Sequence, residues 1–282
     1  MEALTRGRGI VDPYESGRLR DMNTGPRELT SAAAALLARV VGPPLNSALG
    51  RLGFQLTRKA EQDHSSMRAG LARAARRGPA LGAMIDVGAS DGRWSEVARH
   101  FFPTAEILLI EANETHRAGL ESFRSRVPHS DFVLAAAGNK VGHLFFDGSD
   151  PFGGLASTEA MEQSSAVPAT TIDHEVASRS LPGPYLIKLD THGYELPILQ
   201  GAENTLPRTE LLIVEVYNFT LCQGALRFYE MCTHLAQLGF RPIDLCDPMY
   251  RARDGVFWQC DMFFARSDRS EFLSNTYDRP SD

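Results

Sequence analysis

Acidic residues and glycines alternate in the segment Ile85–Gly92, which reads IDVGASDG. The segment follows an apolar run and precedes a helical pattern, and such strand-to-helix turns are where open α/β sheets bind ligands. Gly88 and Gly92 let the backbone turn tightly and approach a ligand. Their Gly-x-x-x-Gly spacing differs from the Gly-x-Gly-x-x-Gly of dinucleotide sites. Asp86 and Asp91 would repel a phosphate but suit a cationic ligand, although a glycine-rich turn without any ligand can look the same.

A further acidic residue, Glu111, ends the next apolar run and lies 19 residues after Gly92. An acidic residue about 20 residues beyond a glycine-rich turn accepts hydrogen bonds from the ribose hydroxyls of a bound nucleoside. The turn and the glutamate together predict a nucleoside ligand without a phosphate. S-adenosyl-L-methionine fits, because it joins a nucleoside to a sulfonium and an amino acid. The predicted cofactor-binding residues are Asp86, Gly88, Asp91, Gly92, Glu111 and Asp190.

Two later segments bring further polar residues to the same edge of the predicted sheet. YLIKLDTHGYE at 185–195 delivers Asp190 and His192, and LLIVEVYN at 211–218 delivers Glu215. We predict that His192, Asp190 and Glu215 are catalytic. A neutral imidazole near pH 7 suits removal of a hydroxyl proton, and either carboxylate could orient the ring. Asp190 is the competing base or a contact of the cofactor amine, and His192 could instead cap the next helix or face solvent.

The same three residues allow a different hypothesis. Two carboxylates and an imidazole are plausible ligands of a divalent metal, so Asp190, His192 and Glu215 could support a metal-assisted reaction. Acidic residues at strand ends are more often neighbours of a cofactor, and we therefore predict no metal. A catalytically silent binding protein with the same fold is a further alternative. The acidic cofactor residues argue against it, since a silent relative has no need of them.

From residue 81 onward, short apolar runs alternate with helical patterns, which predicts βαβ crossovers and a parallel sheet. The last two runs have no helix between them and should form an antiparallel pair. The predicted fold class is therefore α/β and Rossmann-like, with a mixed sheet that ends in an antiparallel hairpin. The expected strands are 83–87, 107–110, 132–136, 185–189, 211–216, 240–245 and 256–264, and the expected helices lie near 92–102, 114–126, 193–204 and 225–238.

Three regions are expected along the chain. Residues 1–79 form a partly disordered and helical extension, which includes a helix at 30–41, a basic amphipathic segment at 45–59 and a helix at 61–77. The catalytic domain is 80–268, and 269–282 form a C-terminal tail. Residues 147–168 are rich in Gly, Ser and Pro, which predicts one long loop that is either functional or disordered, and we expect 147–160 to open and close over the acceptor.

Charge and cysteine content limit the partners. The net charge of the 282 residues is −6, which argues against nucleic acid. Residues 1–80 carry 13 Lys and Arg against 7 Asp and Glu, so weak contact with a membrane surface is possible for this basic segment. The four cysteines lack metal-site spacing and indicate reduced thiols. No apolar stretch is long enough to span a bilayer, so we predict a soluble cytoplasmic protein whose partner is a small-molecule hydroxyl acceptor.

Residues 80–265 resemble the FkbM-type family of class I S-adenosylmethionine-dependent methyltransferases. The resemblance implies a seven-stranded sheet and O-methylation, often of sugars or of secondary metabolites such as polyketides and glycolipids. Many members have an acidic residue in place of His192, so this side chain takes no role from them. The motifs that carry the resemblance are IDVGASDG, LLIEAN, the run at Val167–Asp173, IKLDTHGYELPILQGAE and LLIVEVYN. The matching positions are Asp86, Gly88, Asp91, Gly92 and Glu111 in the cofactor motif and Asp190, Gly193, Glu195 and Gly201 in the fourth-strand signature.

Overall fold

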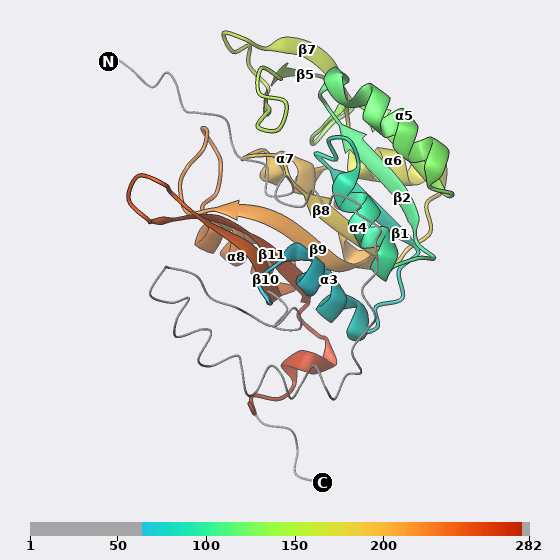
Figure 1. The fold of residues 1–282 in the computed structure, drawn as a ribbon, viewed down its shortest axis with the longest axis vertical. Coiled ribbons are helices and arrows are strands. Elements are labelled where there is room, and N and C mark those ends of the chain that lie inside the picture. The colour runs from blue at the N-terminus through green and yellow to red at the C-terminus, as the bar shows by residue number, and fades with distance from the viewer. Residues whose placement is uncertain (1–63, 278–282) are drawn as a thin grey trace, which may run out of the picture. The chain divides into compact units, whose positions relative to one another are not determined.

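Seven strands form the central sheet of the computed structural model, which describes residues 64–277 (Figure 1). Their order is β10-β11-β9-β8-β1-β2-β3. The five strands from β9 to β3 run parallel, whereas β11 is antiparallel to both β9 and β10. The predicted mixed sheet with an antiparallel hairpin is thereby confirmed. The strands are β1 Ala83–Val87, β2 Glu106–Glu111, β3 Ser130–Leu134, β8 Tyr185–Leu189, β9 Thr209–Tyr217, β10 Phe240–Tyr250 and β11 Phe257–Arg266.

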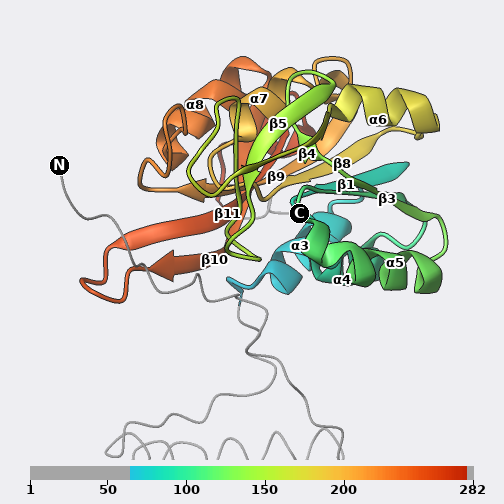
Figure 2. The same cartoon turned by 90° about the horizontal axis from the view of Figure 1, so that it is seen from above.

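Helices cover both faces of this sheet, with α3, α4 and α5 on one side and α6, α7 and α8 on the other (Figure 2). All four helices expected within the catalytic domain are present, and α6 is an additional crossover helix. Within residues 64–277, no helix has the length and apolar content that a membrane span requires. The helices are α3 Met67–Arg76, α4 Arg93–Phe101, α5 Arg117–Arg126, α6 Ile172–Arg179, α7 Glu195–Gln200 and α8 Phe228–Gln237, with 3-10 turns at Glu114–His116, Leu206–Arg208 and Ser270–Phe272.

The two faces of the sheet differ in chemistry. The face toward α6, α7 and α8 is apolar and carries the main hydrophobic core, which includes Ile187 and Val214. On the opposite face, the neighbouring strands β1 and β8 place Asp86 directly beside Lys188, and both side chains are buried. Buried charges are costly unless they are paired, so hydrophobic packing alone does not account for the charged side chains on this face.

Helix α3 is shorter than expected. It begins at Met67, not at residue 61, because the side chain of Ser66 caps it by accepting a hydrogen bond from the backbone N–H of Ala69. Arg73 on this helix forms an ion pair with Asp244 of β10 at 2.7 Å. The helix therefore packs on the sheet, in the same compact unit, although it precedes the expected domain boundary at residue 80. The helix at 30–41 and the segment at 45–59 lie outside the described residues.

A second, four-stranded sheet of order β4-β7-β5-β6 lies at the top of the view in Figure 1. Residues 147–168 were expected to be one long loop, and this expectation is wrong. Two strands occupy part of the segment, which leaves two shorter loops, 148–154 between β5 and β6 and 158–164 between β6 and β7. The pattern is hidden because β6 has only three residues, all half-buried, and β7 is exposed at three of its six residues, so neither strand shows apolar alternation. The strands are β4 Ala136–Ala137, β5 Gly142–Asp147, β6 Leu155–Ser157 and β7 Ser165–Thr170.

Candidate cofactor and active site

The turn between β1 and α4 lies against the end of β8. Gly88 and Gly92 both adopt left-handed backbone conformations, with φ of 77° and 87°. A Cβ atom on Gly88 would lie 2.0 Å from the carbonyl oxygen of Asp190, so no larger residue fits there. The glycine thus brings the first motif and the fourth-strand signature together at one edge of the sheet, as the sequence predicted.

Glu111 at the end of β2 holds this turn in place. Its Oε2 accepts a hydrogen bond from the backbone N–H of Ser90 at 2.7 Å, and its Oε1 accepts one from Asn113 at 2.7 Å. Burial raises the pKa of this carboxyl group above its ordinary value. A carboxylate oxygen has two lone pairs, so each oxygen can still accept one further hydrogen bond. The two oxygens can therefore take a pair of hydroxyl groups, which is the donor pattern of a ribose.

The two aspartates of the first motif have different surroundings. Asp86 is fully buried, and its Oδ2 accepts a hydrogen bond from the hydroxyl of Ser95 at 2.7 Å. Its Oδ1 has no hydrogen-bond partner among residues 64–277, and burial raises the pKa of Asp86 to about 6. Asp91 instead forms an ion pair with Arg93 at 2.8 Å, and the hydrogen bond from Arg93 lowers the pKa of Asp91. The structure therefore places Asp86, and not Asp91, among the buried charges.

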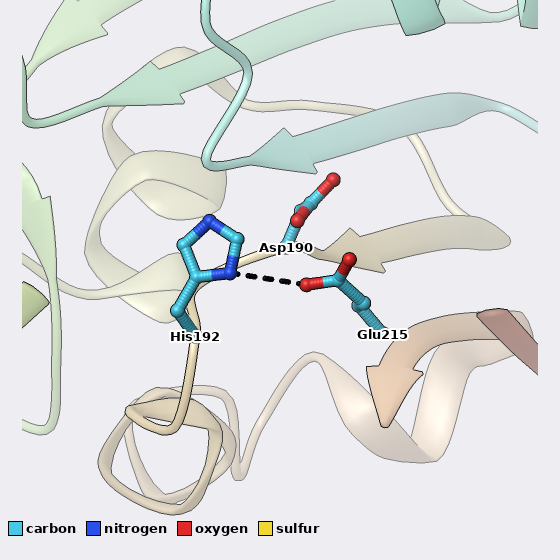
Figure 3. Close-up of side chains that lie close together, drawn as sticks. All are labelled: Asp190, His192 and Glu215. Carbon is cyan, nitrogen blue, oxygen red and sulfur yellow. Dashed lines mark ion pairs between the residues drawn. The ribbon is translucent and has the colours of Figure 1, made fainter. Parts of the chain in front are cut away.

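The three side chains that were predicted to be catalytic converge (Figure 3). One ligand atom of each lies within 4.8 Å of the others. Nδ1 of His192 lies 3.1 Å from Oε2 of Glu215 and 2.7 Å from the hydroxyl of Tyr217. Tyr217 in turn donates to Glu215, and the amide of Gln259 donates to the other oxygen of the same carboxylate. Glu215 is thus fixed from three sides and anchors the imidazole.

The protonation state of His192 differs from the expectation. Burial alone would lower its pKa, but the hydrogen bond and charge of Glu215, together with the charge of Asp190, raise it to about 10. Nε2 of His192 donates to the carbonyl oxygen of Phe152 at 2.8 Å. Because a carbonyl oxygen only accepts, both ring nitrogens carry protons when Nδ1 donates to Glu215. The predicted neutral imidazole is therefore wrong for this arrangement, which favours the imidazolium.

The loop 148–154 reaches both halves of the site, a contact that the sequence did not indicate. His116 donates from Nε2 to the carbonyl oxygen of Pro151 at 2.8 Å, beside the hydrogen bond between His192 and Phe152. The guanidinium of Arg93 lies 5.1 Å from the centre of the Phe152 ring. Two histidines and an arginine therefore hold the loop over the turn and over the predicted catalytic residues.

Lys188 is a second feature that the sequence interpretation missed. It is the fourth of the five residues of β8, is 1 % exposed and donates a hydrogen bond to Asp190. Burial alone would lower its pKa, but the charges of Asp190, Asp261 and Asp86 raise it above the ordinary value. The sequence feature that could have revealed Lys188 is its position as a charged residue within the apolar run 185–189.

Other residues of the fourth-strand signature shape the backbone. Glu195 is buried and accepts a hydrogen bond from the backbone N–H of Gly193 at 2.9 Å, which closes the turn after His192. A Cβ atom on Gly201 would lie 2.0 Å from the carbonyl oxygen of Gly138, so the end of α7 packs directly against a neighbouring chain segment. These residues hold the signature loop in place.

This sheet, with its antiparallel last strands and its glycine-rich turn beside an acidic strand end, has the Rossmann-like fold of class I S-adenosylmethionine-dependent methyltransferases. The family model described as the methyltransferase FkbM domain matches residues 86–242, which is more than half of the chain. The chain therefore belongs to the FkbM methyltransferase family and is an S-adenosylmethionine-dependent methyltransferase.

Comparison with curated proteins finds no significant match. Among solved structures, the chain is similar to the 1,6-didemethyltoxoflavin-N1-methyltransferase of Burkholderia thailandensis, with 14 % identity, 87 % of this chain and 93 % of that chain covered, and a TM-score of 0.40. It is also similar to the precorrin-6y C5,15-methyltransferase of Geobacter metallireducens, with 13 % identity, 75 % and 93 % covered, and a TM-score of 0.38. The family assignment rests on the matched domain and not on these distant likenesses.

Proposed function

We propose that the protein transfers a methyl group from S-adenosylmethionine to a hydroxyl group of a small molecule, such as a sugar, a glycolipid or a polyketide-type metabolite. The observation that carries this proposal is the imidazole of His192, which is anchored by Glu215 at the edge where the glycine-rich turn lies. A hydroxyl acceptor must lose its proton as it is methylated, and a positioned histidine beside a carboxylate suits that task.

The residues around the turn fit the cofactor. S-adenosylmethionine supplies a methyl group on a sulfonium, and it also carries an ammonium group. We propose that Glu111 binds the ribose hydroxyls of the cofactor and that Asp86 and Asp190 bind its cationic groups. Asp91 belongs to the same cofactor-binding turn. The unpaired buried oxygen of Asp86 and the free lone pairs of Glu111 support this assignment. Gly88 and Gly92 let the backbone approach the cofactor.

In the proposed reaction, Nε2 of His192 accepts the hydroxyl proton while the oxygen forms its bond to the methyl carbon, whose bond to sulfur breaks so that S-adenosylhomocysteine leaves. Glu215 and Tyr217 hold Nδ1–H and thereby orient the ring. The carbonyl oxygen of Phe152 must first leave Nε2, and its departure removes one of the contacts that raise the pKa of His192. The arrangement in the structure is that of the protonated ring, in which both N–H groups have acceptors.

The experiment that tests this function uses S-adenosylmethionine with a 13C-labelled methyl group and a panel of sugars, glycolipids and polyketides. We expect products whose labelled carbon has the chemical shift of an O-methyl group. The same reaction with excess EDTA should keep its rate, because the ammonium of Lys188 and the hydroxyl of Tyr217 already contact Asp190 and His192. Loss of activity with EDTA and its return with a divalent metal would favour the metal-assisted alternative. Exclusive N- or C-methylation would contradict the proposed acceptor class.

Limited proteolysis tests the loop 148–154. Gly148, Gly153 and Gly154 allow this segment to open, and the acceptor needs the position of the Phe152 carbonyl. We expect cleavage within the loop to slow severalfold when S-adenosylhomocysteine and acceptor are both bound. Phe152→Ala, which removes the ring beneath Arg93, should be cleaved faster. Equal cleavage rates in all states would contradict the lid.

A further inference from the structure

The face of the sheet toward α4 contains one lysine among buried acids. Lys188 lies beside Asp86 in the β1–β8 register, and its own strand places Asp190 two residues further on the same face. Nζ of Lys188 donates to Oδ2 of Asp190 and lies 5.6 Å from the centre of the Trp94 ring. The lysine side chain is 2 % exposed, whereas that of Asp190 is 27 % exposed. One side of Asp190 therefore contacts the buried ammonium group of Lys188, and its other side is exposed toward the site.

Acids outnumber bases around this lysine. Asp261 on β11 pairs in register with Glu215 on β9, which lies next to β8. Oδ1 of Asp261 is buried and has no hydrogen-bond partner in the part of the chain that the structure describes. Like charges at close range favour the neutral form of a carboxyl group or its rotation away. The contact with Lys188 counters this tendency at Asp190, the one acid of the group to which the lysine donates a hydrogen bond within residues 64–277.

We propose that Lys188 is a positioning residue whose ammonium group holds the carboxylate of Asp190 ionised and directed toward the cofactor. The lysine does not reach the site itself, because its side chain is enclosed between β1, β8 and Trp94. It acts by fixing the group that faces the cationic part of the cofactor. This inference rests on the proposed contact between Asp190 and the cofactor.

A double-mutant cycle tests this inference, with the dissociation constant of S-adenosylhomocysteine measured by calorimetry. Lys188→Met and Asp190→Asn should each weaken binding by about 10- to 100-fold, which corresponds to the loss of a hydrogen bond to a charged group. Because the lysine acts through the aspartate, Lys188→Met should add less than about threefold in the Asp190→Asn background. Effects that multiply in full would overturn the inference, since they would mean that Lys188 acts independently of Asp190.

Two further variants separate this role from a structural one. Lys188→Met leaves buried acids without their counter-charge, so Lys188→Met/Asp261→Asn provides a variant with one charge of each sign removed. It should fold and still bind weakly, and wild-type affinity in it would overturn the inference. Arg73→Met, which breaks the distant ion pair with Asp244, should lower Tm without changing affinity. If Asp190→Asn alone binds normally, the proposed role of Asp190 fails; if only Lys188→Met binds normally, the inference alone fails.

Discussion

His192→Ala is expected to lower kcat by about 10²- to 10⁴-fold, the usual contribution of a positioned acid–base group, while the affinity for S-adenosylhomocysteine stays unchanged. The imidazole contacts Glu215, Tyr217 and the carbonyl of Phe152, and none of these groups is assigned to the cofactor. Steady-state kinetics and calorimetry measure the two quantities separately. His143→Ala, at an exposed histidine, is the matched control and should keep wild-type kcat.

The dependence of kcat/KM on pH tests whether His192 is the group that accepts the proton. The pKa of His192 is raised to about 10, so its base form appears as the pH rises through that value. The kcat/KM of the wild type should therefore rise with pH, with a midpoint above the ordinary histidine value of about 6.5. Glu215→Gln removes one of the two carboxylate charges that raise the pKa of His192, so the midpoint should move toward lower pH. This limb should be absent in His192→Ala, and an unchanged limb would mean that another group, with Asp190 next in line, accepts the proton.

The raised pKa also links His192 to stability. A group whose pKa is higher in the folded protein contributes stability that is complete below its unfolded pKa, about 6.5, and is lost as the pH rises through about 10. The proton that anchors the ring to Glu215 therefore stabilises the closed arrangement at neutral pH. Opening of the loop 148–154 removes the Phe152 carbonyl, which accepts the proton on Nε2 of His192, and so removes one of the contacts that raise this pKa.

The sequence predicted where Gly88, Gly92 and Glu111 lie relative to the strands because local spacing determines these positions. Gly88 and Gly92 follow β1 directly, and the position of Glu111 depends only on one crossover helix. The pairing of Asp86 with Lys188 depends instead on the register of two strands about 100 residues apart, which periodicity does not specify. Lys188 was therefore interpreted as part of an apolar run.

Periodicity likewise does not specify which groups surround His192. Gln259 approaches Glu215 because β9 and β11 pair in one antiparallel register, Tyr217 follows Glu215 by two residues on β9, and Phe152 arrives from a loop of the second sheet. The hydrogen bond and charge of Glu215, the charge of Asp190 and the contact with Phe152 raise the pKa of His192 and so reverse the expected charge of the imidazole. A residue can thus be placed correctly by its motif while its protonation state is set by neighbours that are distant in sequence.

Glu111→Ala is expected to weaken binding of S-adenosylhomocysteine by about 10²- to 10⁴-fold. The variant loses two charge-assisted hydrogen bonds to ribose, each worth about 1.5–3 kcal/mol. Glu111 also accepts hydrogen bonds from the backbone of Ser90 and Asn113, so part of the loss could come from a loosened turn. A 2′,3′-dideoxy analogue of the ligand separates the two causes. It should bind the wild type weakly and lose little more in Glu111→Ala, whereas a loosened turn would weaken both ligands equally. Glu114→Ala, at an exposed acid paired with Arg117, should bind like the wild type, and unchanged affinity in a folded Glu111→Ala protein would contradict the assigned cofactor site.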